Sequence, residues 1–466
     1  MTVTRRSLLA GAAGVSVLAL AACTPDPPRP APTATTPPPV DPLRPLSIRR
    51  SDWTRDGFAQ GATSFIPVGE TPDRRDDLAA PVDDRLFFAG EATSRTAPSS
   101  LEGARESGER AAEELLAVAA EGERIAVVGA GLAGAIAARR IRDAGFEVLL
   151  IEARERVGGR IRTIDGDDQQ PDELGALWLR EGRDDVLLAA LEEAGVETAP
   201  LRRTSVRTAE QQLDAALVEE AVVAIDASVA ATAETVAFDL PVSGAIALLG
   251  ALPDEAPAPS APSPRAAVGL YTDGLGIATG AEARRISTRY ALDELPSGDR
   301  LLSIGGLARY VDSLLDGIDV LQSSAVTTVQ RDEGSLSLRL GAGESLTVDR
   351  AVMTVPLGVL QSGGITFEPE LPLVNRRGIA ALGVGYLETV WVRYAEAVWT
   401  ERAETWSLVP TDGGPDIRTW VNLQPVTGDA VLVGLLSGAE ARRFAGLGDE
   451  QATDAVVAAL EPFLRD

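Results

Sequence analysis

Residues 125–152, which read IAVVGAGLAGAIAARRIRDAGFEVLLIE, decide the fold of this chain. An apolar strand at 125–128 runs into a G-x-G-x-x-G turn at 129–134, a helical stretch at 135–144 and a second apolar strand at 147–151. This order predicts a βαβ unit that binds a dinucleotide. The glycines let backbone N–H groups approach a pyrophosphate, and the acid at 152 can accept hydrogen bonds from a ribose. The predicted contacts are Gly129, Gly131, Leu132, Ala133, Gly134 and Glu152.

The next residues, EARERVGGR at 152–160, narrow the identity of the cofactor. They resemble the E-x-R-x-x-x-G-G-R signature of the FAD-dependent amine oxidases, the family of the flavin-containing monoamine and polyamine oxidases. The resemblance implies FAD as the cofactor and an α/β fold, with a Rossmann-type FAD-binding domain and an α+β substrate-binding domain. It also implies cofactor contacts from four further residues, because arginine and backbone donors can bind the pyrophosphate. These are Ala153, Arg154, Gly159 and Arg160.

Further segments match the same family in the same order. LGALW at 174–178 resembles the segment that passes beside the flavin ring, which implies contacts from Leu177 and Trp178. AVTTV at 325–329 resembles the strand whose valine backbone meets the adenine, which points to Val326. TVPLGVL at 354–360 is another close match. Each apolar run alone could be ordinary core, but their shared order favours the family interpretation.

One family hallmark stands in an unexpected place. The F-x-G-E motif, which relatives carry near the C-terminus, occurs here within LFFAGEAT at 86–93, ahead of the dinucleotide motif. The resemblance implies FAD contacts from Gly90, from Glu91 and from the backbone N–H of Leu101. Because the last block of the family, here 47–120, precedes all the others, we interpret the chain as circularly permuted. An artefact of gene assembly is the simpler alternative.

The chain then divides into seven predicted parts. They are a twin-arginine lipoprotein signal (1–23), a proline-rich tether (24–46), the permuted FAD-binding segment (47–120), the Rossmann FAD-binding unit (121–185), a first part of the substrate domain (186–299), the continuation of the FAD-binding domain (300–365) and a second part of the substrate domain (366–466).

The N-terminus has the features of an export signal. An arginine pair at 5–6 precedes an apolar run from Leu8 to Ala22 that is too short for a usual membrane span. The run ends in LAAC, which resembles a bacterial lipobox, and Cys23 is the only cysteine of the chain. We therefore expect export, with lipidation of Cys23 anchoring the protein to the outer face of the bacterial cytoplasmic membrane. An ordinary signal with a chance cysteine is the alternative.

The composition excludes several kinds of chemistry. The chain has 69 acidic and 43 basic residues, a formal charge of −26, so we expect no nucleic-acid partner. It contains neither histidine nor lysine, which excludes a histidine base, a lysine Schiff base and histidine metal ligands. The single cysteine excludes internal disulfides and cysteine-based metal sites. We expect no metal site.

The resemblance implies oxidation of a small amine by FAD and O2. A hydride would leave the carbon beside nitrogen for flavin N5, the imine would hydrolyse, and O2 would be reduced to hydrogen peroxide. Many relatives hold a water near N5 with the lysine of a G-x-G-x-x-x-K pattern, whose position here is Thr389, the predicted catalytic residue. Two aromatic positions that flank the amine in relatives correspond to Thr63 and Ser100. With no cysteine suited to linking FAD, the cofactor should be non-covalent.

Two alternatives stay open at this point. The first is an L-amino acid oxidase or dehydrogenase of the same fold, which needs an arginine clamp for the substrate carboxylate. The second is a flavin-binding lipoprotein with impaired catalysis, suggested by the threonine at 389 and the missing aromatics.

Overall fold

The computed structural model describes residues 44–166, 169–292, 294–295 and 298–464. The predicted signal at 1–23, with Cys23, and most of the predicted tether lie outside these residues. No helix in the described part of the chain has the length and apolar character needed to cross a membrane.

The dinucleotide motif directly follows strand β4 of a five-stranded parallel sheet. The strand order of this sheet is β13-β5-β4-β17-β3. The predicted βαβ unit is confirmed as β4, α3 and β5. The helix begins at Leu132, three residues earlier than predicted, because Gly131 caps it and its carbonyl accepts the N–H of Ala135 at 2.9 Å. The elements are β3 (Leu86–Phe88), β4 (Ile125–Val128), α3 (Leu132–Asp143), β5 (Val148–Ile151), β13 (Val320–Leu321) and β17 (Arg350–Met353).

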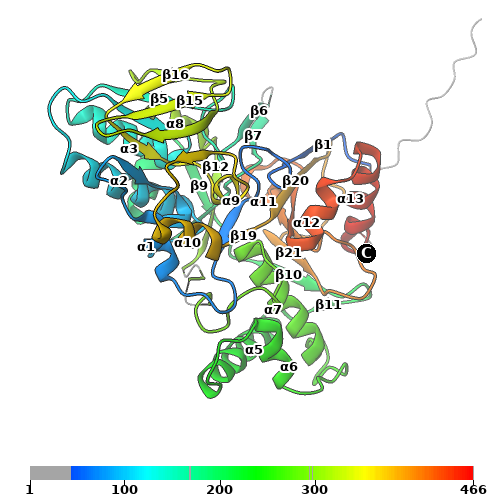
Figure 1. Ribbon diagram of the computed structural model, residues 1–466. Coiled ribbons are helices and arrows are strands. Elements are labelled where there is room, and N and C mark those ends of the chain that lie inside the picture. The colour runs from blue at the N-terminus through cyan, green and yellow to red at the C-terminus, as the bar shows by residue number, and fades with distance from the viewer. Residues whose placement is uncertain (1–43, 167–168, 293, 296–297, 465–466) are drawn as a thin grey trace, which may run out of the picture. The chain divides into compact units, whose positions relative to one another are not determined.

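The segment before the dinucleotide motif is built into the same layer. Strand β3 pairs with β17 in parallel. Helix α2 (Leu101–Leu116) packs along α3, and both helices are labelled in Figure 1. Gly108 permits this close approach, since a Cβ there would collide with the carbonyl of Ala133. Residues 117–124 alone connect α2 to β4. The two segments therefore form one packed unit around the motif.

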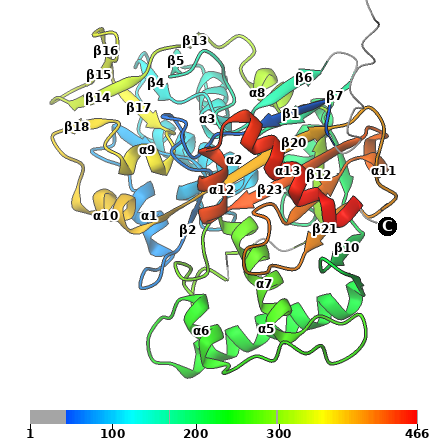
Figure 2. The ribbon, with the colours of Figure 1, turned by 90° about the vertical axis from the view of Figure 1, so that its right-hand side faces the viewer.

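A seven-stranded sheet forms the other side of the fold. Its strand order is β1-β20-β23-β22-β21-β10-β11, and α12 and α13 pack beside it (Figure 2). Buried Trp406 and Trp420 lie in its core. Its elements are β1 (Ser47–Arg50), β10 (Thr204–Arg207), β11 (Gln212–Leu213), β20 (Leu387–Arg393), β21 (Thr405–Leu408), β22 (Thr419–Asn422), β23 (Val431–Ser437), α12 (Gly438–Ala445) and α13 (Asp449–Leu464).

Smaller sheets connect these two layers. In one of them, β15 pairs antiparallel with β14, so these two strands form a hairpin. The strands are β2 (Thr63–Phe65) with β19 (Gly383–Gly385), β6 (Thr163–Gly166) with β7 (Gln169–Glu173), β8 (Trp178–Arg180) and β9 (Glu197–Pro200) on either side of β12 (Arg300–Ile304), and the sheet of β14 (Val326–Arg331), β15 (Leu336–Leu340), β16 (Ser345–Val348) and β18 (Thr366–Glu368).

The remaining helices surround these sheets, and α5, α6 and α7 pack together at the lower edge in Figures 1 and 2. They are α1 (Asp73–Ala79), the 3-10 helix η1 (Glu91–Thr93), α4 (Asp185–Glu193), α5 (Ala215–Thr235), α6 (Val242–Leu248), α7 (Pro264–Thr279), α8 (Ala308–Leu314), α9 (Leu357–Gln361), α10 (Leu373–Ala381) and α11 (Gln424–Thr427).

Candidate active site

A single continuous cavity of about 470 Å³ passes from the dinucleotide motif to the seven-stranded sheet. Its volume is in the range of small-molecule and cofactor sites. The segment before the motif, the motif itself and the large sheet all contribute to its wall. Of the residues predicted to bind cofactor or substrate, those on the wall are Thr63, Gly90, Glu91, Ser100, Leu101, Gly129, Gly131, Leu132, Ala133, Glu152, Ala153, Arg154, Gly159, Arg160, Leu177, Trp178, Val326 and Thr389.

Gly134 is the exception among the predicted contacts, because it does not line the cavity. A Cβ at this position would collide with the carbonyl of Gly129, so the structure needs glycine here for steric reasons. The third glycine of the motif therefore lets helix α3 start close to strand β4, which gives it a packing role.

The dinucleotide end of the cavity has an open glycine cradle. Gly129 and Gly159 have φ angles of +106° and +58°, which side chains rarely adopt. A Cβ on Gly131 would meet no protein atom nearer than 3.8 Å, so the space above this glycine belongs to the cavity. Gly131 is also the N-cap of α3, where free N–H groups and the helix dipole favour a phosphate. This cradle fits the pyrophosphate of FAD.

Glu152 is held in a fixed orientation beside the cradle. It is almost fully buried, and its carboxylate accepts the N–H of Ala130 at 2.8 Å and of Arg154 at 2.9 Å. Each carboxylate oxygen thus keeps a second lone pair available on the cavity side. The position therefore fits a ribose that donates two hydroxyl hydrogen bonds.

Arg154 of the signature and Arg156, two residues further on, have different partners. Arg154 forms an ion pair with Asp56 at 2.8 Å, so sequence reasoning missed the residue that orients it. Arg156 donates hydrogen bonds to the carbonyls of Val157, Ile161 and Gly159, and burial lowers its pKa to about 10. The first arginine reaches the cavity wall, whereas the second stabilises the loop that carries the glycine pair.

Glu91 joins the segment before the motif to the motif itself. Its buried carboxylate accepts hydrogen bonds from Arg160 at 3.0 Å, from the hydroxyl of Ser64 at 2.7 Å and from the N–H of Ser99 at 3.0 Å. Arg160 also donates to the carbonyl of Ala62 at 2.7 Å. The acid of the F-x-G-E motif is therefore both a wall residue and the link between the two chain segments.

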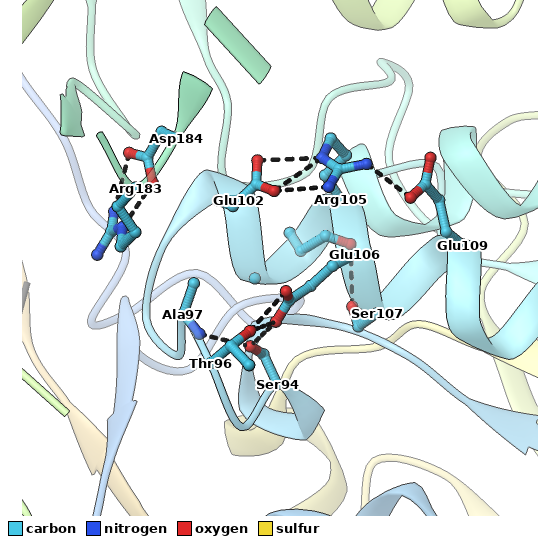
Figure 3. Close-up of polar contacts among 12 residues, drawn as sticks. Ser94, Thr96, Ala97, Glu102, Arg105, Glu106, Ser107, Glu109, Arg183 and Asp184 are labelled. Atoms are coloured by element: carbon cyan, nitrogen blue, oxygen red, sulfur yellow. Dashed lines mark hydrogen bonds and ion pairs between the residues drawn. The ribbon is translucent and has the colours of Figure 1, made fainter. Parts of the chain in front are cut away.

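Ion pairs along α2 fix the start of this helix, which reaches the cavity at Leu101. Arg105 bridges Glu102 and Glu109, each at 2.6 Å, as Figure 3 shows. Ser100 caps the helix, because its hydroxyl accepts the N–H of Gly103 at 3.0 Å and donates to the carbonyl of Ala97 at 2.6 Å. Ser100, which is predicted to contact the substrate, thus lies on the wall, but its hydroxyl donates its hydrogen bond to the protein backbone.

The opposite end of the cavity contains Thr63 and Thr389. Thr63 donates its hydroxyl to the carbonyl of Thr279 at 2.7 Å. The hydroxyl of Thr389 makes one long hydrogen bond, 3.4 Å, to the carbonyl of Leu174. Of these two hydroxyls, that of Thr389 is the more available to a bound water or ligand.

Glu388 lies next to Thr389 on the wall. It accepts hydrogen bonds from the hydroxyl of Ser51, from the N–H of Trp53 at 3.2 Å and from the N–H of Thr54 at 2.8 Å. Burial raises the pKa of Glu388. The three donors lie on residues that directly follow β1, so the segment before the motif also holds this end of the cavity.

Comparisons with known proteins agree with this geometry. A family model described as flavin containing amine oxidoreductase matches residues 34–116, 132–252 and 262–466. Polyamine oxidase 4 of Oryza sativa subsp. japonica is 28% identical over 374 residues, which cover 73% of this chain and 73% of the relative.

Two solved structures share the fold. One is putrescine oxidase bound to putrescine, with a TM-score of 0.56, 21% identity, and coverage of 73% of this chain and 81% of that chain. The other is cyclohexylamine oxidase from Brevibacterium oxydans IH-35A, with a TM-score of 0.53, 21% identity, and coverage of 72% and 79%.

Replacement of Glu152 by alanine should remove bound flavin. The change deletes the ribose acceptor and frees the N–H groups of Ala130 and Arg154 from their partner. Purified Glu152→Ala protein should show little flavin absorbance per chain. The matched control is Glu155→Ala, an exposed acid of the same loop, which should keep full flavin content. Full flavin content in Glu152→Ala would overturn the assignment.

Proposed function

This chain belongs to the family of flavin-containing amine oxidoreductases, and from that premise we propose that it oxidises a small amine with non-covalently bound FAD and O2. The bound FAD supplies hydride acceptance from the carbon beside nitrogen and electron transfer to O2. Overall, the amine, O2 and water become a carbonyl compound, ammonia and hydrogen peroxide. The observation that carries this proposal is the continuity of one cavity from Gly131 to Thr389.

The protein residues act by binding, orientation and exclusion of water. The cradle at Gly131 and the carboxylate of Glu152 would hold the dinucleotide, and Glu91 would accept a hydrogen bond from a ribityl hydroxyl. Beyond them the wall includes the apolar side chains of Ile277, Leu387, Leu435 and Leu436. An apolar wall orients a small substrate and keeps water away from the reacting carbon. Binding, orientation and exclusion of water need neither histidine nor lysine, so the absence of both residues is compatible with the proposal.

The proposal predicts turnover of amines. FAD-loaded protein mixed with panels of amines and amino acids under air should bleach its flavin transiently and release hydrogen peroxide. Bleaching with amino acids and not with simple amines would restrict the substrate to amines that carry a carboxylate, as in an amino acid oxidase of the same fold. A flavin that stays oxidised with every compound, yet is reduced by dithionite, would favour the catalytically impaired alternative and contradict the proposal.

The hydroxyl of Thr389 should assist the reaction with O2 by holding a water. Thr389→Val keeps the shape of the side chain but removes this hydrogen bond, so flavin reoxidation by O2 should slow by about 2- to 10-fold. Flavin content should not change, and Thr389→Ser should restore the rate. Stopped-flow measurement of both half-reactions separates this effect from substrate oxidation. An unchanged reoxidation rate in Thr389→Val would remove Thr389 from the mechanism.

We further propose that the chain is a circular permutation of the family fold. Support comes from the pairing of β3 with β17, the packing of α2 along α3 and the short link at 117–124. A rotated chain, beginning at 121 and carrying 44–120 after 466 through a flexible linker, should bind one FAD. Its thermal midpoint should lie near that of the parent, because the segment keeps its contacts. Failure of the rotated chain to fold and bind FAD would contradict the proposal.

We also propose that the protein is exported and anchored by a lipid on Cys23, which lies outside the described residues. The twin-arginine pair, the short apolar run and the LAAC sequence support this. In a bacterial host, the full chain should incorporate labelled palmitate and fractionate with membranes. Cys23→Ser should lose the label and leave the membrane fraction while keeping FAD. A labelled or membrane-bound Cys23→Ser protein would refute the anchor.

A further inference from the structure

Two arginines face each other across a strand pair on the cavity wall. Strand β12 pairs antiparallel with β8, and this register places Arg300 opposite Arg180. Both side chains line the cavity. The Arg300 guanidinium lies over the ring of Trp178, 5.3 Å from its centroid. Because Trp178 is the residue predicted to lie beside the flavin ring, this cationic pair belongs to the reacting end of the cavity.

Within the described part of the chain, the guanidinium groups of these two arginines form no ion pair. The Arg180 guanidinium donates one hydrogen bond, to the carbonyl of Gly298 at 3.1 Å, while the backbone N–H of Arg180 donates to Asp184 at 2.7 Å. The Arg300 guanidinium contacts Trp178. Most other charged residues of the wall are paired, as Figure 3 shows for Arg183 and Asp184. The pairs are Arg154–Asp56 at 2.8 Å, Arg160–Glu91 at 3.0 Å, Arg183–Asp184 at 2.5 Å and Arg75–Glu294 at 2.7 Å.

The burial of this pair is unfavourable in the absence of an anion. Burial and, to a smaller extent, the nearby charges of Arg300 and Arg183 lower the pKa of Arg180 to about 10, although the charge of Asp184 acts in the opposite direction. Burial also lowers the pKa of Arg300. Like charges that are partly removed from water destabilise each other unless a negative group joins them. Two guanidinium groups at one wall offer planar donors that match the geometry of a carboxylate.

We propose that the amine substrate carries a carboxylate, which Arg180 and Arg300 bind. This inference rests on the proposed function and narrows its substrate class to amino acids. With O2 and water, such a substrate gives an oxo acid, ammonia and hydrogen peroxide. The arginines act as binding residues for the carboxylate, and the amine-bearing carbon is then directed to the flavin end of the same cavity.

The test compares each amino acid with the amine that lacks its carboxylate, such as leucine with 3-methylbutylamine and ornithine with putrescine. In wild-type protein, kcat/KM should favour the amino acid. Arg300→Met and Arg180→Met should each lower kcat/KM for the amino acid by about 10- to 100-fold, the loss expected for a charged hydrogen bond. The same variants should leave the matched amine nearly unaffected. Arg300→Lys should recover part of the preference.

The control variant is Arg442→Met. Arg442 likewise lies over an aromatic ring, that of Tyr386 at 4.9 Å, but it is outside the cavity wall. This change removes one charge, one cation–π contact and the ion pair with Glu282 at 3.0 Å, and it should alter the kcat/KM of neither substrate. A wild-type preference for the decarboxylated amines, or equal losses on both substrates in Arg300→Met, would overturn the proposal.

A binding measurement separates this proposal from the function on which it rests. A carboxylate without an amine, 4-methylpentanoate, is titrated into FAD-loaded protein, and the flavin absorbance spectrum reports binding. Wild-type protein should bind it, with a Kd about 10- to 100-fold weaker in Arg300→Met. If no compound is oxidised but this difference appears, the carboxylate site stands and the proposed turnover fails. If wild-type protein does not bind it, or Arg300→Met binds it equally, the carboxylate site is overturned.

Discussion

The ion pair between Glu91 and Arg160 is the contact on which the site depends. It joins two segments that lie 69 residues apart in the chain, and it is reinforced by Ser64 and Ser99. Removing one partner of a buried ion pair costs about 3–5 kcal/mol, because the other charge stays buried without compensation. Arg160 retains partial exposure, so the cost here should lie toward the lower end. The pair holds the segment at 63–101 against the glycine loop and thereby closes one wall of the cavity.

The charged side chains of the cavity wall have different partners at its two ends. At the dinucleotide end, Arg154 and Arg160 have carboxylate partners, so the positive charge there is largely balanced before any ligand binds. At the opposite end, Glu388 is buried among neutral donors, and the guanidinium groups of Arg180 and Arg300 form no ion pair among the described residues. The chain as a whole has a charge of −26, but the wall near Trp178 is locally cationic. The net charge of the surface is therefore a poor guide to the charge of the substrate.

Much of the fold could be predicted from sequence because its signals are local. The strand, glycine turn and helix of the βαβ unit occupy consecutive residues, so this unit brings most of the motif residues, Gly134 excepted, to one wall of the cavity. The sequence predicts the start of helix α3 three residues too late, since the spacing of apolar residues does not reveal that Gly131 caps the helix. The sequence predicts that Gly134 contacts the cofactor, and the structure adds its proximity to the Gly129 carbonyl, which no local pattern reveals.

Other features depend on pairings between distant residues, which one sequence does not reveal. The register of β8 with β12 brings together Arg180 and Arg300, and nothing near either residue indicates the partnership. The same holds for Arg154 with Asp56 and for Glu388 with the turn after β1. These contacts need the three-dimensional arrangement of chain segments, and they decide the charge of the site.

The central claim is that both ends of this cavity belong to one FAD site, completed by the segment before the dinucleotide motif. A crystal structure of the flavin-loaded protein tests it most directly. We predict density for one FAD that extends from Gly131 and Glu152, past Glu91, to the wall formed by Trp178 and Thr389. Flavin density elsewhere, or a flavin that makes no contact with residues 63–101, would contradict the account.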